Sequence, residues 1–173
     1  MPRHLHLVLA LLLAPLAAAP ALRAAAPAPE SAPRAGSTYL FYGAGLVERL
    51  LEEGSLEAGL QLAYPELGLR VRSLAWTGDE VGHRRRPEGY SEHLKGLFAA
   101  WPADIVVLGY GFNESFAGAA GLADFRRQYE ILLGEIARRH PGARLVFLAP
   151  PAVEERSAPP GAARNADVAA YAA

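Results

Sequence analysis

Hydrophobic positions along this chain follow two alternating patterns from residue 37 onward. Short apolar runs, rich in β-branched and aromatic residues, predict strands over residues 38–42, 69–74, 105–110 and 144–149. Between them lie longer segments in which apolar residues recur every three or four positions, and this spacing predicts amphipathic helices over residues 46–60, 90–101, 122–140 and 165–173. The chain therefore alternates predicted strands with predicted helices.

This alternation predicts the fold class. Strands separated by helices of this length form βαβ units, whose right-handed crossovers place helices on both faces of a parallel sheet. We expect a flavodoxin-like, three-layer α/β/α sandwich with the strands, numbered along the chain, in the order 2-1-3-4. Because no strand follows the last helix before Ala173, we expect an incomplete C-terminal part and an exposed edge at residues 144–149.

The N-terminal segment has the pattern of an export signal. Arg3 precedes an apolar run from Leu5 to Leu16, and Ala24-Ala25-Ala26 offers a cleavage site of small residues. Two prolines interrupt the segment, whereas a retained membrane anchor, the alternative, needs about 20 apolar residues. We predict a signal peptide over residues 1–26, a Pro/Ala-rich linker over 27–37 and one domain over 38–173. The expected location is periplasmic or secreted, with no membrane span after cleavage.

The composition of the chain excludes several classes of function. The 173 residues carry a formal net charge of −1 and no cysteine. A near-neutral chain gives no indication of nucleic acid as a partner, and the missing cysteines exclude disulfides and thiolate chemistry. His93 and His140 lie on predicted helices without a second histidine at ligand spacing, so we expect neither a metal nor a cofactor.

Three loops follow the first three predicted strands and carry the candidate chemistry. They are Gly43-Ala44-Gly45, Trp76-Thr77-Gly78-Asp79 and Gly111-Phe112-Asn113-Glu114. In open parallel sheets, ligands bind beyond the carboxyl ends of the strands. The Asn113 amide is suited to an oxyanion, because it is uncharged and donates two N–H bonds. We expect Gly45, Gly78 and Asn113 to converge within about two strand spacings, on the order of 10 Å.

This layout resembles the SGNH, or GDSL-like, hydrolase family over residues 38–173. In that family a Gly-Asp-Ser motif after the first strand carries the nucleophile. A Gly after the second strand and the Asn of a Gly-x-Asn-Asp motif after the third complete the oxyanion hole, and a C-terminal Asp-x-x-His supplies the base and its orienting acid. The resemblance implies that Gly78 and Asn113 form the oxyanion hole and that Gly45 occupies the nucleophile position.

The resemblance also implies a substrate-binding role for Gly111, Asp79 and Glu114, although Glu114 replaces the final Asp of the third motif. The implied activity is hydrolysis of a carboxyl ester, either a small molecule or an acylated carbohydrate. No cofactor is implied.

Two departures weaken the implied activity. Ala44 and Gly45 stand where the family has Asp and Ser, so the hydroxyl nucleophile is missing. No Asp-x-x-His follows Asn113, which we interpret as the mark of a fragment. We therefore expect impaired hydrolysis. The alternative is a non-catalytic module that binds a glycan or a partner in the same crevice. A third and weaker hypothesis is a flavodoxin-like domain that binds an anionic ligand at a helix N-terminus. It is weaker because Gly43-Ala44-Gly45 matches no phosphate-binding motif.

Other polar residues of these loops have competing interpretations. Ser115 and Thr77 are candidate substitute nucleophiles, but both residue types are common in turns. Asp79 and Glu114 are a candidate pair for acid–base or metal chemistry, although acids in exposed loops are usually solvated.

Two further features point to sugars. Trp76 is a candidate for stacking on a sugar ring, while a large aromatic residue at a strand end is more often part of the core. The basic run His83-Arg84-Arg85-Arg86 is a candidate for binding an acidic glycan. A solvated loop is the alternative for this run.

Overall fold

The computed structural model describes residues 32–84, 96, 100–154 and 161–172. The predicted signal peptide, the first part of the linker and nearly all of the helix predicted over residues 90–101 lie outside the described residues, as do His93, Arg85 and Arg86. Among the described helices, none is long and apolar enough to cross a membrane.

A four-stranded parallel sheet forms the centre of the described domain, in the order β2-β1-β3-β4. Its strands are β1 (Thr38–Gly43), β2 (Arg70–Ser73), β3 (Ile105–Gly109) and β4 (Arg144–Phe147). The predicted strand order is confirmed, and each predicted run contains one strand. Within the described residues β4 pairs with β3 alone, and Leu145 and Phe147 are exposed there, as expected for an edge.

The helices are α1 (Gly45–Glu52), α2 (Ser55–Ala63), α4 (Gly118–Arg139) and α5 (Gly161–Ala172), with 3₁₀ turns η1 (Pro65–Leu67) and η2 (Glu114–Ala117). The segment predicted as helical over residues 46–60 is two helices. Gly54 separates them, because its φ of 70° lies in the left-handed region, which glycine adopts without penalty. The last helix begins at Gly161, four residues before the predicted start.

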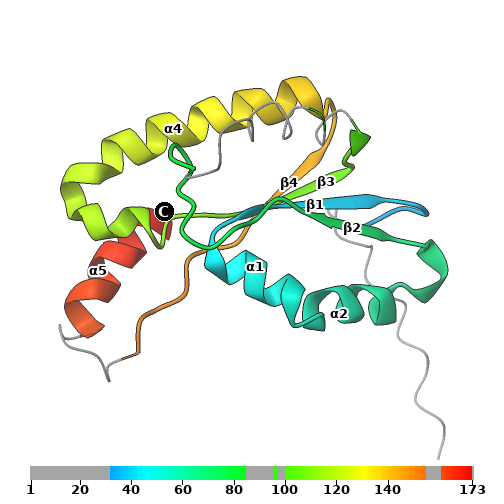
Figure 1. Cartoon of the computed structure of the whole chain (residues 1–173), viewed down its shortest axis with the longest axis horizontal. Coiled ribbons are helices and arrows are strands. Elements are labelled where there is room, and N and C mark those ends of the chain that lie inside the picture. The colour runs from blue at the N-terminus through cyan, green and yellow to red at the C-terminus, as the bar shows by residue number, and fades with distance from the viewer. Residues whose placement is uncertain (1–31, 85–95, 97–99, 155–160, 173) are drawn as a thin grey trace, which may run out of the picture.

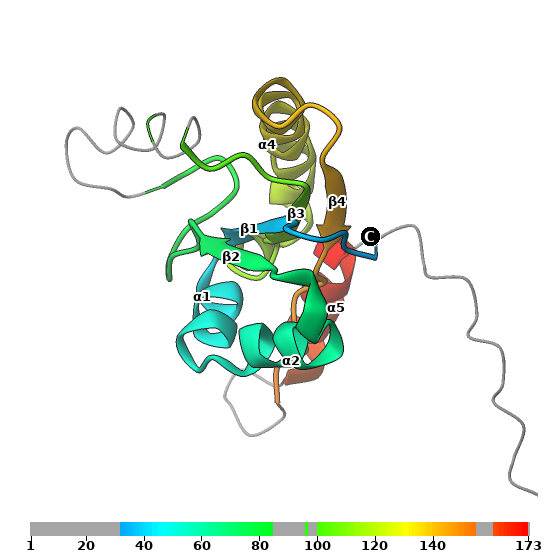
Figure 2. The ribbon, with the colours of Figure 1, turned by 90° about the vertical axis from the view of Figure 1, so that its right-hand side faces the viewer.

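Helices cover both faces of the sheet, with α4 on one face and α1 and α2 on the other (Figures 1 and 2). The strands β1 and β3 are buried along their whole length. Alternate residues of β1 therefore enter two separate cores: Leu40 and Tyr42 pack with Phe125, Leu132 and Ile136 of α4, while Tyr39 and Phe41 pack with Val47 of α1. The predicted three-layer sandwich is confirmed.

The helix α5 packs against η2 and the start of α4 rather than over the middle of the sheet (Figure 1). The Tyr171 hydroxyl donates a hydrogen bond to the Gly118 carbonyl at 2.8 Å, and the Tyr171 ring lies 4.9 Å from the Phe125 ring. This position brings α5 to the carboxyl end of β3.

Candidate functional site

A pocket of about 350 Å³ lies at the carboxyl ends of the strands. The loops that follow β1, β2, β3 and β4 all contribute to its walls. Its lining includes Gly45, Thr77, Gly78, Phe112, Asn113, Pro150 and Pro151. The structure thus brings the three expected residues Gly45, Gly78 and Asn113 together, while their chemical roles stay predictions. None of the three lines the cavities of about 540 and 620 Å³, while Asn113 also lines one of about 260 Å³.

Gly45 is the first residue of α1 and stands at the pocket wall. A Cβ atom added there would lie 3.0 Å from the Thr77 hydroxyl oxygen. The Thr77 backbone N–H donates to the Glu48 carboxylate at 2.6 Å, which ties the loop after β2 to the first turn of α1. A threonine hydroxyl therefore lies beside the position where the family resemblance expects a serine.

The tight approach of α1 to the sheet explains why β1 and β3 both end in glycine. A Cβ on Gly43 would lie 2.5 Å from Val47 Cγ2 and 2.7 Å from the Gly109 carbonyl oxygen. A Cβ on Gly109 would lie 2.4 Å from the same methyl group of Val47. These contacts are too short for any side chain. The two glycines therefore allow the start of α1 to sit directly over the strand ends.

Gly78 supplies a turn in the loop after β2. Its φ of 85° lies in the left-handed region, and it is exposed. Among the contacts of the described chain, its backbone N–H makes no hydrogen bond. Gly78 lines the pocket, so this N–H is a candidate donor to a ligand there.

Asn113 is held by a hydrogen bond to the neighbouring loop. Its side-chain amide donates to the Asp79 carbonyl oxygen at 2.9 Å. An asparagine amide carries two hydrogens, so a second donor remains after this bond is made. The bond fixes the side chain of Asn113 at the pocket wall.

Glu114 and Asp79 are buried, so the expectation that they are solvated is wrong. The Glu114 carboxylate accepts hydrogen bonds from the backbone N–H groups of Val81 at 2.7 Å and Gly111 at 2.8 Å. Burial raises the pKa of Glu114, and these N–H donors oppose the rise. Glu114 therefore braces two loops against each other.

Neither acid lines the pocket that Gly45 and Asn113 share. Gly111, whose φ is 108°, does not line it either. The substrate-binding role of these three residues stays a prediction. No cluster of three or more His, Cys, Asp or Glu side chains that could hold a metal ion occurs in the described part of the chain.

Ser115 is a turn residue with no exposed surface. Its hydroxyl donates to the Phe112 carbonyl oxygen at 2.6 Å and accepts a hydrogen bond from Arg164 at 2.8 Å. Ser115 does not line the pocket, which favours the structural interpretation over a substitute nucleophile.

The environments of Trp76 and Arg84 differ from those that are more common for such residues, a core position and a solvated loop. Trp76 is 55% exposed, so its expected place in the core is wrong. It directly precedes the two pocket residues Thr77 and Gly78. Arg84 is half-buried and its Nη2 donates to the Val81 carbonyl oxygen at 3.4 Å, whereas the preceding His83 is exposed.

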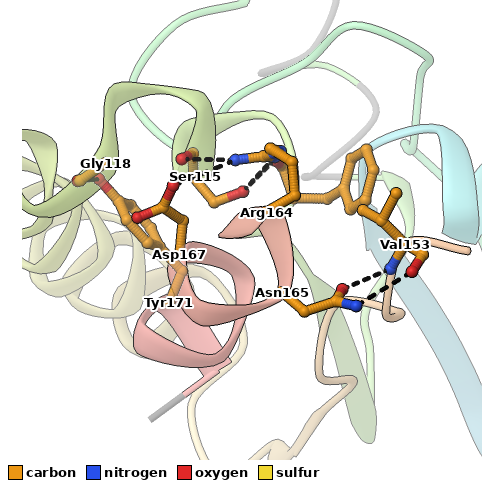
Figure 3. Close-up of polar contacts among 8 residues, drawn as sticks. Ser115, Gly118, Val153, Arg164, Asn165, Asp167 and Tyr171 are labelled. Carbon is orange, nitrogen blue, oxygen red and sulfur yellow. Dashed lines mark hydrogen bonds and ion pairs between the residues drawn. The ribbon is translucent and has the colours of Figure 1, made fainter. Parts of the chain in front are cut away.

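Sequence reasoning missed Arg164 and Asn165 of α5, which contact the loops that form the pocket (Figure 3). Their partners are remote in sequence, and a polar residue in a short helix gives no local indication of such a contact. Only the position of α5 at the strand ends, which follows from the whole fold, brings them there.

The comparisons with known proteins agree with this geometry at the level of the fold. No protein-family model matches the chain, and no curated protein matches it by sequence. A gut microbial diltiazem-metabolizing enzyme superposes with a TM-score of 0.60 at 14% identity, over 79% of this chain and 33% of its own. A protein described as an SGNH hydrolase from Slackia heliotrinireducens gives 0.57 at 16%, over 79% and 71%.

A third similar structure is an active-site mutant of a family two carbohydrate esterase from Clostridium thermocellum, with a TM-score of 0.51 at 15% identity. It covers 81% of this chain and 50% of its own, and it was solved with a bound carbohydrate. The chain thus spans between a third and seven tenths of these proteins. The similarity covers about four fifths of this chain, and the described domain has the α/β fold of the SGNH hydrolases.

Proposed function

We propose that this chain is an exported SGNH-fold protein whose pocket binds a small or carbohydrate ester and is impaired in cleaving it. The observation that carries the proposal is Gly45, which begins α1 at the pocket wall, where the resemblance requires the serine nucleophile. The covalent acyl transfer that the resemblance implies needs a side-chain nucleophile at this position, and glycine has none. The Gly78 N–H and the Asn113 amide remain as donors for an ester carbonyl.

Hydrolysis of p-nitrophenyl acetate tests the impaired chemistry. We expect the chain to release p-nitrophenol at the rate of buffer alone, and Gly45→Ser to do the same. A serine fits at this position after a small shift of the exposed Thr77 side chain. It would remain a weak nucleophile, because no histidine lines the pocket among the described residues. Turnover by the unmodified chain, lost in Thr77→Val, would contradict the proposal.

Binding is tested with an acetylated xylo-oligosaccharide and its deacetylated form, by calorimetry and by the NMR shift of the Asn113 side-chain amide. We expect the acetylated form to bind at least about fivefold more tightly, since a hydrogen bond to a carbonyl contributes roughly 1 kcal/mol. Asn113→Ala should remove this preference. Equal affinity for both forms would contradict recognition of an ester.

A second candidate function is a glycan-binding module without ester chemistry, and the exposure of Trp76 favours it. An indole ring can stack on the apolar face of a ligand while its N–H group remains exposed to solvent. In this case both oligosaccharides should bind equally, and Trp76→Ala should weaken both by the same factor. The ester-binding proposal instead expects a preference that survives in Trp76→Ala.

Export is proposed from residues 1–26 alone, on their charge, apolar run and small residues. Expression in a bacterial host with and without these residues tests it. We expect the longer chain in the periplasmic fraction at a reduced mass, and the shorter chain in the cytoplasm. Full-length protein in the membrane fraction would favour a retained anchor instead.

A further inference from the structure

We infer that Arg164 of α5 is a positioning residue for the pocket, and that its neighbour Asn165 assists it from the same helix. Arg164 fixes the turn that presents Phe112 and Asn113, and Asn165 fixes the segment that follows Pro150 and Pro151. This inference rests on the proposed function of the pocket. Neither residue lines the pocket, so both act through other residues.

Arg164 holds the turn after β3 with polar and aromatic contacts (Figure 3). Its Nη1 donates to the Ser115 carbonyl oxygen at 2.9 Å, and its Nη2 donates to the Ser115 hydroxyl at 2.8 Å. The Ser115 hydroxyl in turn donates a hydrogen bond to the Phe112 carbonyl oxygen at 2.6 Å. Arg164 thereby fixes both Ser115 and the backbone of Phe112, which flank Asn113.

The guanidinium of Arg164 also lies over two aromatic rings. Its central carbon is 3.9 Å from the centre of the Phe116 ring and 5.9 Å from that of Phe112. The Arg164 side chain is only 13% exposed, so its guanidinium is largely removed from water, while the Phe116 ring that it covers is exposed on its other side. A planar, forked group with several donors is required to make all of these contacts at once.

Asn165 holds a second wall of the pocket. Its side-chain oxygen accepts a hydrogen bond from the Val153 N–H at 2.6 Å, and its amide nitrogen donates to the Val153 carbonyl oxygen at 3.0 Å (Figure 3). Val153 lies two residues after Pro151, which lines the pocket. Two successive residues of one helix therefore secure the loops after β3 and after β4.

The helix that carries them is itself anchored. Tyr171, near the end of α5, bonds to Gly118. A Cβ on Gly111 would lie 3.1 Å from the Tyr171 carbonyl oxygen and 3.5 Å from Pro150. The absence of a side chain at Gly111 therefore lets α5 and the loop after β4 approach the turn after β3. The position of α5 thus determines the separation of two pocket walls.

Hydrogen exchange of the full chain tests the positioning role without a ligand. Arg164→Met keeps an unbranched apolar stem, and Arg126→Met, at an exposed arginine of α4, is the matched control. We expect the N–H groups of Gly111 and Ser115 to lose at least tenfold in protection in Arg164→Met, while β1 and β3 change less than twofold. An equal loss in strands and turn would overturn the inference, because the role would then be merely structural.

Affinity for the acetylated xylo-oligosaccharide gives the second readout, measured where every variant is fully folded. Arg164→Met should bind at least fivefold more weakly, Arg126→Met should bind like the unmodified chain, and Arg164→Lys should be intermediate because an ammonium cannot reproduce the fork. A loosened turn with unchanged affinity would overturn the inference. If the unmodified chain binds no ester, the proposed function fails, and hydrogen exchange alone decides whether Arg164 holds the turn.

Discussion

Glycines determine what the strand ends of this protein can do. Gly45 removes the side chain at the expected nucleophile position, and Gly43 and Gly109 let α1 approach the sheet. Gly78 provides a turn with a φ of 85° that other residues adopt at a cost. Gly45 thus lacks the side chain that the resemblance expects, while the other glycines shape the backbone around the pocket.

Exchanging two glycines for alanine separates these roles. Gly43→Ala places a methyl group 2.7 Å from a backbone oxygen, so we expect the free energy of unfolding to fall by about 1–3 kcal/mol. Gly59→Ala, within α2 and with nothing within 4 Å, should raise it by about 0.5–1 kcal/mol. Urea denaturation followed by circular dichroism measures both. A Gly43→Ala variant as stable as the unmodified chain would contradict the close packing of α1.

The two acids that sequence reasoning misjudged, Asp79 and Glu114, are buried. The positions of Gly45, Gly78 and Asn113 could be predicted, because the strand pattern places their loops at one edge of the sheet. The burial of Glu114 could not, since it depends on the N–H groups of Val81 and Gly111, and Val81 belongs to another loop. Trp76 shows the opposite error, because a residue after a strand end need not turn toward the core.

At the scale of elements, the spacing of apolar residues correctly predicted which face of the longest helix is buried. The α4 helix has Phe125, Leu132 and Ile136 on its buried face, at spacings of seven and four residues. The break between α1 and α2 was not predicted, because both helices share one apolar pattern and only the left-handed Gly54 divides them. Boundaries therefore depend on single residues, whereas the existence of an element depends on its whole pattern.

Two neighbouring residues of α4 test this face. Leu132 is 3% exposed and Ile131 is 51% exposed. We expect Leu132→Ala to lower the free energy of unfolding by about 2–5 kcal/mol through a cavity in the core. Ile131→Ala should change it by less than about 0.5 kcal/mol. Chemical denaturation compares the two, and similar losses would mean that α4 is rotated from its described orientation.

At the scale of the whole molecule, the order β2-β1-β3-β4 puts the two buried strands in the centre and their loops at the pocket. The alternation of strands and helices predicted the parallel sheet, and the order was the one expected of a flavodoxin-like fold. The attachment of α5 to the strand ends was not predictable, because it depends on contacts such as those of Arg164 and Tyr171 that only the assembled fold creates.

His140 makes the stability of the molecule depend on pH. Burial, with the charge of Arg139, lowers the pKa of His140 below its ordinary value of 6.5. The unfolded chain then binds the proton more readily than the folded chain. The stability that depends on neutral His140 is therefore fully present above about pH 6.5, and it is lost as the pH falls toward the pKa of His140 in the folded chain. We expect His140→Leu to lose this part of the pH dependence and His83→Gln, at an exposed histidine, to keep it. Melting temperatures between about pH 5 and 8 measure the effect, and an unchanged slope in His140→Leu would contradict it.

The proposed function requires that the pocket contain no activated nucleophile. A fluorophosphonate that reacts with activated serine and threonine hydroxyls tests this claim most directly, with the mass of the intact protein as readout. We expect no added mass in the unmodified chain after an incubation that fully labels an active serine esterase. A stoichiometric adduct, mapped by peptide mass spectrometry to Thr77 or Ser115, would contradict the claim and identify a nucleophile.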